Sequence, residues 1–190
     1  GVESGLLEIK KLASKNYALP LVLTESKKED VTDIYINHLK EIVNPEHINS
    51  SIKFAIDGGN GAIGSVIDSL SSKYGLNYEG IYMDVDGTFP NHPADPSNPK
   101  NLEELVNLVL EKNYQFGVAF DGDADRAVFS DDKGNIISGS IMTAIISDWL
   151  LAKRGEIKVV HNVNVPPSVT SYLNKKGVNL IRSKVGHSYI

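Results

Sequence analysis

Residues 120–126 read Phe-Asp-Gly-Asp-Ala-Asp-Arg and lie between two apolar, β-like runs. The carboxylates of Asp121, Asp123 and Asp125 alternate with small residues, so the backbone can wrap and bring their oxygens to one point. Like charges about 4 Å apart repel by roughly 4 kcal/mol at an effective dielectric near 20. The loop therefore favours a bound cation. All-carboxylate ligation indicates a hard ion, Mg²⁺ before Ca²⁺ or Mn²⁺ and not zinc.

Other interpretations of this loop are a solvated acidic turn and an EF-hand, whose loop carries aspartates at the same alternate spacing. The EF-hand fails where a turn glycine is required, because Arg126 stands there, and where a bidentate glutamate is required, because Asp132 stands there. The flanking runs also alternate like strands, whereas an EF-hand has helices. Arg126 adds a planar guanidinium fork suited to phosphate.

Outward from this loop, strands and helices alternate along the chain, which is the pattern of an α/β protein with helices on its sheet. We expect a short helix within the first thirty residues and a helix with an apolar stripe of Ile34, Leu39, Ile42 and Val43. Further helices are predicted over 63–74, 102–110, 139–153 and after Pro166-Pro167. Strands are predicted over 52–56, 76–83, 115–120, 127–130, 157–161 and 178–181.

The alternation starts again near Ile136, which divides the chain into three parts. Residues 1–32 are predicted to be a tail or linker, and 33–135 an α/β domain with helices on the faces of its sheet. Residues 136–190 are predicted to be a partial second α/β domain of the same type, since the pattern stops soon after its second helix.

Composition sets broad limits on function. Nineteen basic residues against 24 acidic ones leave a net charge of −5, which argues against nucleic acid or an anionic membrane as the main partner. We expect no membrane span and no signal peptide. Cysteine is absent, which excludes disulfide and thiolate chemistry and fits a reducing, cytoplasmic location.

Two further motifs carry competing functions. Residues 59–64 match the G-x-G-x-x-G pattern of dinucleotide-binding turns, but a tight strand-to-helix turn needs glycines for steric reasons alone. We favour that structural role, and we expect Asp57 to put an anion at the mouth of the turn. Residues 84–88 resemble the D-x-D-G-T nucleophile loop of haloacid-dehalogenase phosphatases, with Asp84 as nucleophile. The proline-rich segment 89–93 cannot open the helix that such enzymes place there.

Four motifs in order resemble those of the α-D-phosphohexomutases, of the phosphomannomutase/phosphoglucomutase type, over residues 33–190. They are Asp-Gly-Gly-Asn-Gly at 57–61, Asp-Gly-Thr-Phe-Pro-Asn-His-Pro at 86–93, the loop at 121–126, and Lys-Val-Gly-His-Ser at 184–188. The resemblance implies that hexose 1-phosphate and hexose 6-phosphate are interconverted through a bisphosphosugar and an enzyme phosphoserine. It also implies a mixed sheet sandwiched between helices in residues 33–135. The same resemblance implies Mg²⁺ bound by Asp121, Asp123 and Asp125. Arg126, Lys184 and His187 would bind substrate.

The chain departs from the family pattern in ways that limit this expectation. It contains no T-A-S-H-N-P-like serine loop and no G-E-x-S-G-H sugar-recognition loop, so no catalytic residue is assigned in it. Asn164 stands where some members carry lysine, and Ala124 replaces a family glycine. We therefore interpret the chain as a middle fragment that is inactive alone and needs the family's domains 1 and 4 as partners. A free-standing phosphatase using Asp84 and a non-enzymatic Ca²⁺ module remain the alternatives.

Overall fold

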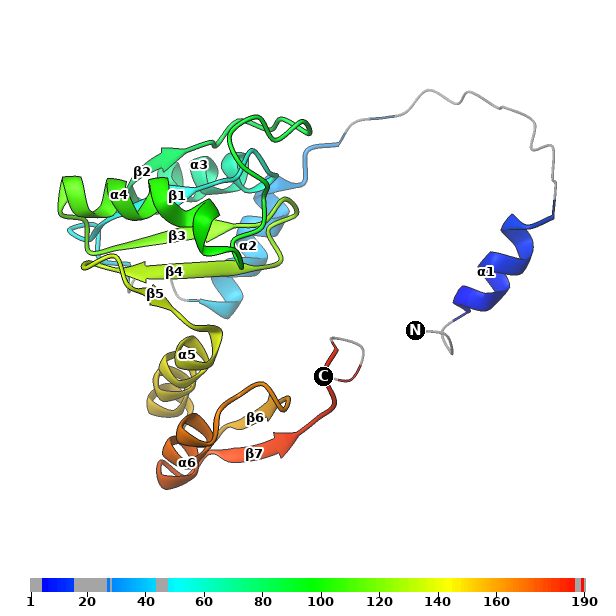
Figure 1. Ribbon diagram of the computed structural model, residues 1–190, viewed down its shortest axis with the longest axis vertical. Helices are drawn as coiled ribbons and strands as arrows, with labels where there is room; N and C mark the ends of the chain where they lie inside the picture. The colour runs from blue at the N-terminus through cyan, green and yellow to red at the C-terminus, as the bar shows by residue number, and fades with distance from the viewer. Residues whose placement is uncertain (1–4, 16–26, 28, 44–47, 187–188, 190) are drawn as a thin grey trace. The chain divides into compact units, whose positions relative to one another are not determined.

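A computed structural model of the protein describes residues 5–15, 27, 29–43, 48–186 and 189 (Figure 1). Its elements follow the order α1 (Leu6–Ala13), α2 (Thr32–Ile42), β1 (Lys53–Asp57), α3 (Ile63–Tyr74), β2 (Asn77–Ile81), the 3₁₀ helix η3 (Pro99–Leu102), α4 (Glu103–Lys112), β3 (Phe116–Phe120), β4 (Ala127–Asp131), β5 (Ile136–Ile137), α5 (Gly139–Arg154), β6 (Lys158–His161), α6 (Pro167–Lys175) and β7 (Asn179–Arg182). None of the helices described is long and apolar enough to cross a membrane.

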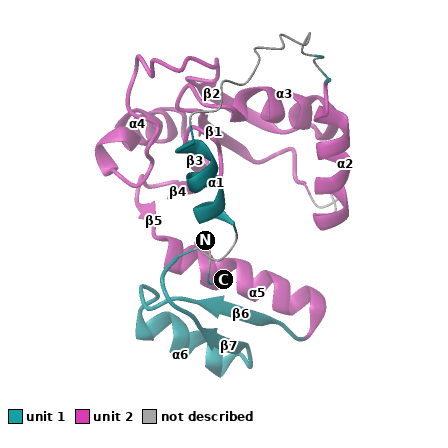
Figure 2. Cartoon of the chain, turned by 90° about the vertical axis from the view of Figure 1, so that its right-hand side faces the viewer, with its two compact units in different colours: residues 1–29, 156–190 teal, residues 30–155 magenta. Residues whose placement is uncertain are grey.

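The chain forms two compact units, coloured separately in Figure 2. Residues 30–155 make the larger unit, and residues 1–29 with 156–190 make the smaller one. In the smaller unit, β6 and β7 pair in parallel, and α6 packs against β7. Leu173 of α6 is buried, as are Ile157 and Val178. The smaller unit is thus α/β as well.

The larger unit contains a five-stranded mixed sheet in the order β2-β1-β3-β4-β5. Strand β1 pairs in parallel with both β2 and β3, while β4 and β5 continue the sheet antiparallel. The carboxyl ends of β2, β1 and β3 therefore lie side by side at one edge, where ligands of open α/β sheets commonly bind. Strand β5 was missed from the sequence because two residues carry too short a pattern to detect.

Neighbouring residues of the central strands point to opposite faces of the sheet. On one face, Ala55 and Ala119 form a core with Leu105 and Val109 of α4. On the other face, their chain neighbours Ile56 and Val118 form a core with Ile67 of α3. Helices therefore cover both faces, and the predicted mixed sheet between helices is confirmed. In α2, which packs on α3, the residue that is buried is Ile36, and Ile34 of the predicted stripe is exposed.

The turn after β1 lies directly against the turn after β3. The amide of Ala62 donates to the carbonyl oxygen of Gly122 at 2.9 Å. A Cβ built on Gly61 would lie 2.6 Å from that same oxygen and 2.9 Å from the Gly122 Cα. The preference for a structural turn is supported by this contact, because only glycine allows the two backbones to approach so closely.

We predict that Gly61→Ala lowers the free energy of unfolding by about 2 kcal/mol, because its methyl group forces two backbones apart. Urea unfolding followed by circular dichroism measures this. Gly87→Ala is the matched control, since a Cβ there meets nothing within 4 Å, and it should stay within about 0.5 kcal/mol of the parent. Equal stability of the two variants would contradict the steric role of Gly61.

Candidate metal centre

Three loops meet at the carboxyl edge of the parallel strands: residues 58–62 after β1, 82–98 after β2, and 121–126 between β3 and β4. Hydrogen bonds from Asn60 join the first loop to the second, and the Ala62 amide joins the first loop to the third. The amide of Asn60 donates to the Tyr82 carbonyl at 2.8 Å, and its side-chain nitrogen donates to the Asp84 carbonyl at 2.9 Å. Three of the four family motifs, at 57–61, 86–93 and 121–126, thus form one structural region.

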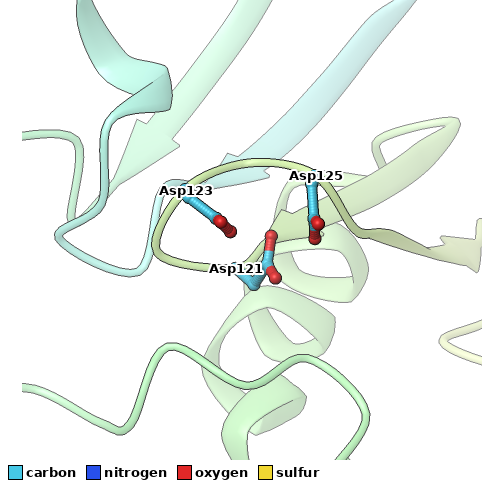
Figure 3. A group of neighbouring side chains, drawn as sticks. All are labelled: Asp121, Asp123 and Asp125. Atoms are coloured by element: carbon cyan, nitrogen blue, oxygen red, sulfur yellow. The ribbon is translucent and has the colours of Figure 1, made fainter. Parts of the chain in front are cut away.

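The three aspartates lie in the hairpin loop that joins β3 to β4, and they point toward one another (Figure 3). One carboxylate oxygen from each of Asp121, Asp123 and Asp125 lies within 4.8 Å of the other two. Asp121 is buried and the others are exposed to solvent. Ala124 makes the wrap possible by taking the left-handed backbone conformation, with φ of 60°. Its amide donates to the Asp121 carbonyl at 3.0 Å.

The pKa values of Asp121 and Asp125 are shifted in opposite directions. The negative charges of Asp123 and then Asp121 raise the pKa of Asp125, because each disfavours ionisation of its neighbour. Burial would raise the pKa of Asp121, but hydrogen bonds from Arg126 and the arginine's charge outweigh burial and lower it. The donor set is three hard oxygens in mutual repulsion, which fits a hard divalent cation such as Mg²⁺.

Arg126 fixes the orientation of Asp121. Its amide donates to Oδ1 of Asp121 at 2.9 Å, and its Nε donates to Oδ2 at 2.6 Å. The guanidinium also contacts Oδ1 of Asp95 in the loop after β2, at 3.4 Å. Sequence reasoning assigned no role to Asp95, which lies two residues beyond the family segment 86–93. The side chain of Arg126 remains 57% exposed, so it can also reach solvent-borne anions.

Asp57 contradicts one expectation. It does not place an anion at the mouth of the glycine turn, because its carboxylate is fully buried. Oδ1 accepts the Gly59 amide at 2.8 Å, and Oδ2 lies 2.9 Å from Nε2 of His92. Sequence reasoning missed this pair, since no pattern relates a strand-end aspartate to a histidine 35 residues later.

The phosphatase-like motif has a different conformation from a nucleophile loop. Asp86 accepts hydrogen bonds from the amide and the hydroxyl of Thr88, at 2.9 and 2.7 Å, which closes a local turn. No helix opens between Thr88 and Asn98, all of them described residues. The preceding strand β2 is the edge strand of the sheet. The haloacid-dehalogenase interpretation gains no support from this geometry.

The remaining predicted substrate residues lie near the end of the chain. Lys184 follows β7 in the smaller unit, and its ammonium lies 5.5 Å from the ring centroid of Tyr189. His187 lies outside the described residues. The substrate roles of Arg126, Lys184 and His187 stay predictions.

The larger unit is an α/β protein with a candidate cation site at the carboxyl edge of its parallel strands. Comparison with known proteins identifies the family. The family model "Phosphoglucomutase/phosphomannomutase, alpha/beta/alpha domain II" matches residues 33–134, and the model of domain III matches residues 138–190. The chain belongs to the phosphoglucomutase/phosphomannomutase family.

Individual relatives agree with this membership. A phosphoglucomutase of Neisseria meningitidis is 35% identical over 86% of this chain and 35% of that protein. A phosphomannomutase of Vibrio cholerae is 31% identical over 99% of this chain and 42% of that protein. A family structure from Burkholderia thailandensis is similar with a TM-score of 0.76 at 27% identity, over 85% of this chain and 35% of that one. The chain thus spans less than half the length of these relatives.

We predict that Ala124→Gly raises the free energy of unfolding by about 0.5–1 kcal/mol, because glycine takes the left-handed conformation without strain. Thermal or urea unfolding measures the change. The control is Ala144→Gly in the middle of α5, where the same replacement should lower stability by about 1 kcal/mol. Destabilisation of similar size at both positions would contradict the strain assigned to Ala124.

Proposed function

We propose that this chain supplies the metal-binding part of a Mg²⁺-dependent phosphohexomutase that interconverts hexose 1-phosphate and hexose 6-phosphate, of mannose or glucose. The observation that carries the proposal is the convergence of Asp121, Asp123 and Asp125 in a chain of this family. The names of the relatives, phosphoglucomutase and phosphomannomutase, support the reaction. The cytoplasmic location stays a prediction.

The chain's own residues divide the work at this site. Asp121, Asp123 and Asp125 would hold Mg²⁺, which when bound offsets negative charge on a phosphoryl group during transfer. Arg126 keeps Asp121 ionised and oriented through its amide and Nε. Because the Arg126 guanidinium is largely exposed, it is also placed to bind a phosphate oxygen.

The rest of the proposed reaction needs groups that these 190 residues do not contain. A phosphoserine, carried in the family by domain 1, would donate its phosphoryl group to the hexose phosphate. The bisphosphosugar formed would then return a phosphoryl group from its other end. Lys184 and His187 would face the sugar phosphate from domain 3, and domain 4 would bind the substrate phosphate. Hexose phosphates, the bisphosphosugar and those two domains are the proposed partners.

We expect the chain to bind Mn²⁺ and expect Mg²⁺ to compete with Mn²⁺ for the same site. Asp123→Asn should weaken Mn²⁺ binding by about tenfold or more, since a charged ligand is lost. Electron paramagnetic resonance of free Mn²⁺ measures the affinity. Asp84→Asn is the matched control and should leave binding unchanged. Micromolar Ca²⁺ binding with no response to Mg²⁺ would instead identify a calcium module.

The 190-residue chain alone is predicted not to convert glucose 1-phosphate to glucose 6-phosphate, because no phosphoserine loop is present in it. A coupled dehydrogenase assay measures conversion, and release of inorganic phosphate is followed in parallel. Turnover by this polypeptide would disprove the inactive-fragment proposal. Phosphate release that is lost in Asp84→Asn but kept in Asp123→Asn would favour the phosphatase alternative.

A further inference from the structure

The buried side chain of Asp57 and the partly buried side chain of His92 face each other at the carboxyl edge, and the proposed cation chemistry uses neither of them. Asp57 is the last residue of β1 and is fully buried. The side chain of His92 is 16% exposed and comes from the loop after β2. The distance from Nε2 of His92 to Oδ2 of Asp57 is 2.9 Å.

The hydrogen-bond partners determine how many protons the pair holds. Nδ1 of His92 lies 2.9 Å from the carbonyl oxygen of Pro93, which can only accept, so Nδ1 carries a proton. The contact between Oδ2 and Nε2 needs a second proton, on either atom. The pair is therefore neutral as a whole, as burial demands. Consistently, burial raises the pKa of Asp57, opposed by the Gly59 amide and by His92.

The pair connects two loops that both lie against the acidic loop. On one side, Oδ1 of Asp57 accepts the Gly59 amide at the start of the turn whose Ala62 amide donates to Gly122. On the other side, the Pro93 carbonyl that accepts from His92 also accepts from the buried Asn101 side chain, at 3.0 Å. This loop continues to Asp95, which contacts Arg126.

We infer that Asp57 and His92 share one proton and act as positioning residues, holding the turn after β1 and the loop after β2 against the acidic loop so that its aspartates stay converged. Neither residue forms a hydrogen bond or ion pair with Asp121, Asp123 or Asp125, all of them described residues, so both act through the backbone that they anchor. The role in cation binding rests on the proposed function, whereas the anchoring of the loops does not.

The charges around the pair are few among the described residues. Glu104 of α4 acts on Asp57 through its charge and accepts a hydrogen bond from the Tyr82 hydroxyl. The Tyr82 ring meets the His92 ring edge-on, with centroids 5.4 Å apart. That hydrogen bond and burial raise the pKa of Tyr82 to about 12, so it stays neutral at physiological pH.

The first test replaces the imidazole while keeping a ring against Tyr82. Of the two hydrogen-bond partners of the buried Asp57 carboxylate described above, His92→Phe removes the imidazole and leaves the Gly59 amide. We expect the hydrogen-exchange protection of the Ala62 amide, read by NMR without metal, to fall about tenfold or more. His38→Gln is the control, because the His38 side chain is 64% exposed, and it should leave Ala62 unchanged. Unchanged protection in His92→Phe would overturn the inference.

A second variant distinguishes proton sharing from a general packing defect and serves if His92→Phe does not fold. In Asp57→Asn, the amide oxygen still accepts from Gly59, and the amide nitrogen can donate to Nε2 of a neutral His92. Protection of Ala62 should therefore match the parent at pH 8.

Loss of Ala62 protection in Asp57→Asn at pH 8 would overturn the shared-proton assignment. Mn²⁺ affinity is measured on the same variants, and we expect His92→Phe to lower it about tenfold. If the parent binds no Mn²⁺ while the exchange results hold, the proposed cation site fails and the anchoring pair stands. If the parent binds Mn²⁺ but the protection of the Ala62 amide is unchanged in His92→Phe, the anchoring role of the pair is disproved and the proposed cation site stands.

Discussion

The close approach of the Gly61 and Gly122 backbones is the constraint on which the rest of the carboxyl edge depends. With 2.6 Å between a hypothetical Gly61 Cβ and the Gly122 oxygen, no side chain fits between the two turns. The Ala62 amide instead donates directly to the Gly122 carbonyl. The acidic loop is consequently joined to the turn of a neighbouring strand by a direct backbone contact.

This arrangement stores backbone strain around the site. Asn60, Tyr82, Phe89 and Ala124 all have positive φ angles between 49° and 60°, and each lies in one of the three loops that meet there. Such a conformation costs a non-glycine residue about 1–2 kcal/mol. The cost is offset by the hydrogen bonds that join the loops, such as the donation from Asn91 to Asn60 at 2.8 Å. Strain held in this way favours one arrangement of the aspartates.

Most elements could be predicted from the sequence, because helical and strand periodicity are local. The helix 63–74 ends at Gly75 in the left-handed conformation, as its pattern predicts. The three aspartates could be found for the same reason, since alternate spacing in one loop already brings them together. The Asp57–His92 pair and the contact between Asp95 and Arg126 could not be found, because both depend on which strands are neighbours. Parallel pairing of β1 with β2 and β3 has no local signature.

The pairing of Arg126 with Asp121 also changes how the acidic loop should be understood. Arg126 lowers the pKa of Asp121, so that carboxylate is ionised and oriented by the protein itself. The repulsion that a cation would relieve therefore falls mainly on Asp123 and Asp125, which are exposed to solvent and screened by it. Three converging aspartates do not by themselves imply tight binding. An ion at this loop gains a prepared ligand in Asp121, but it gains only a screened attraction from the other two.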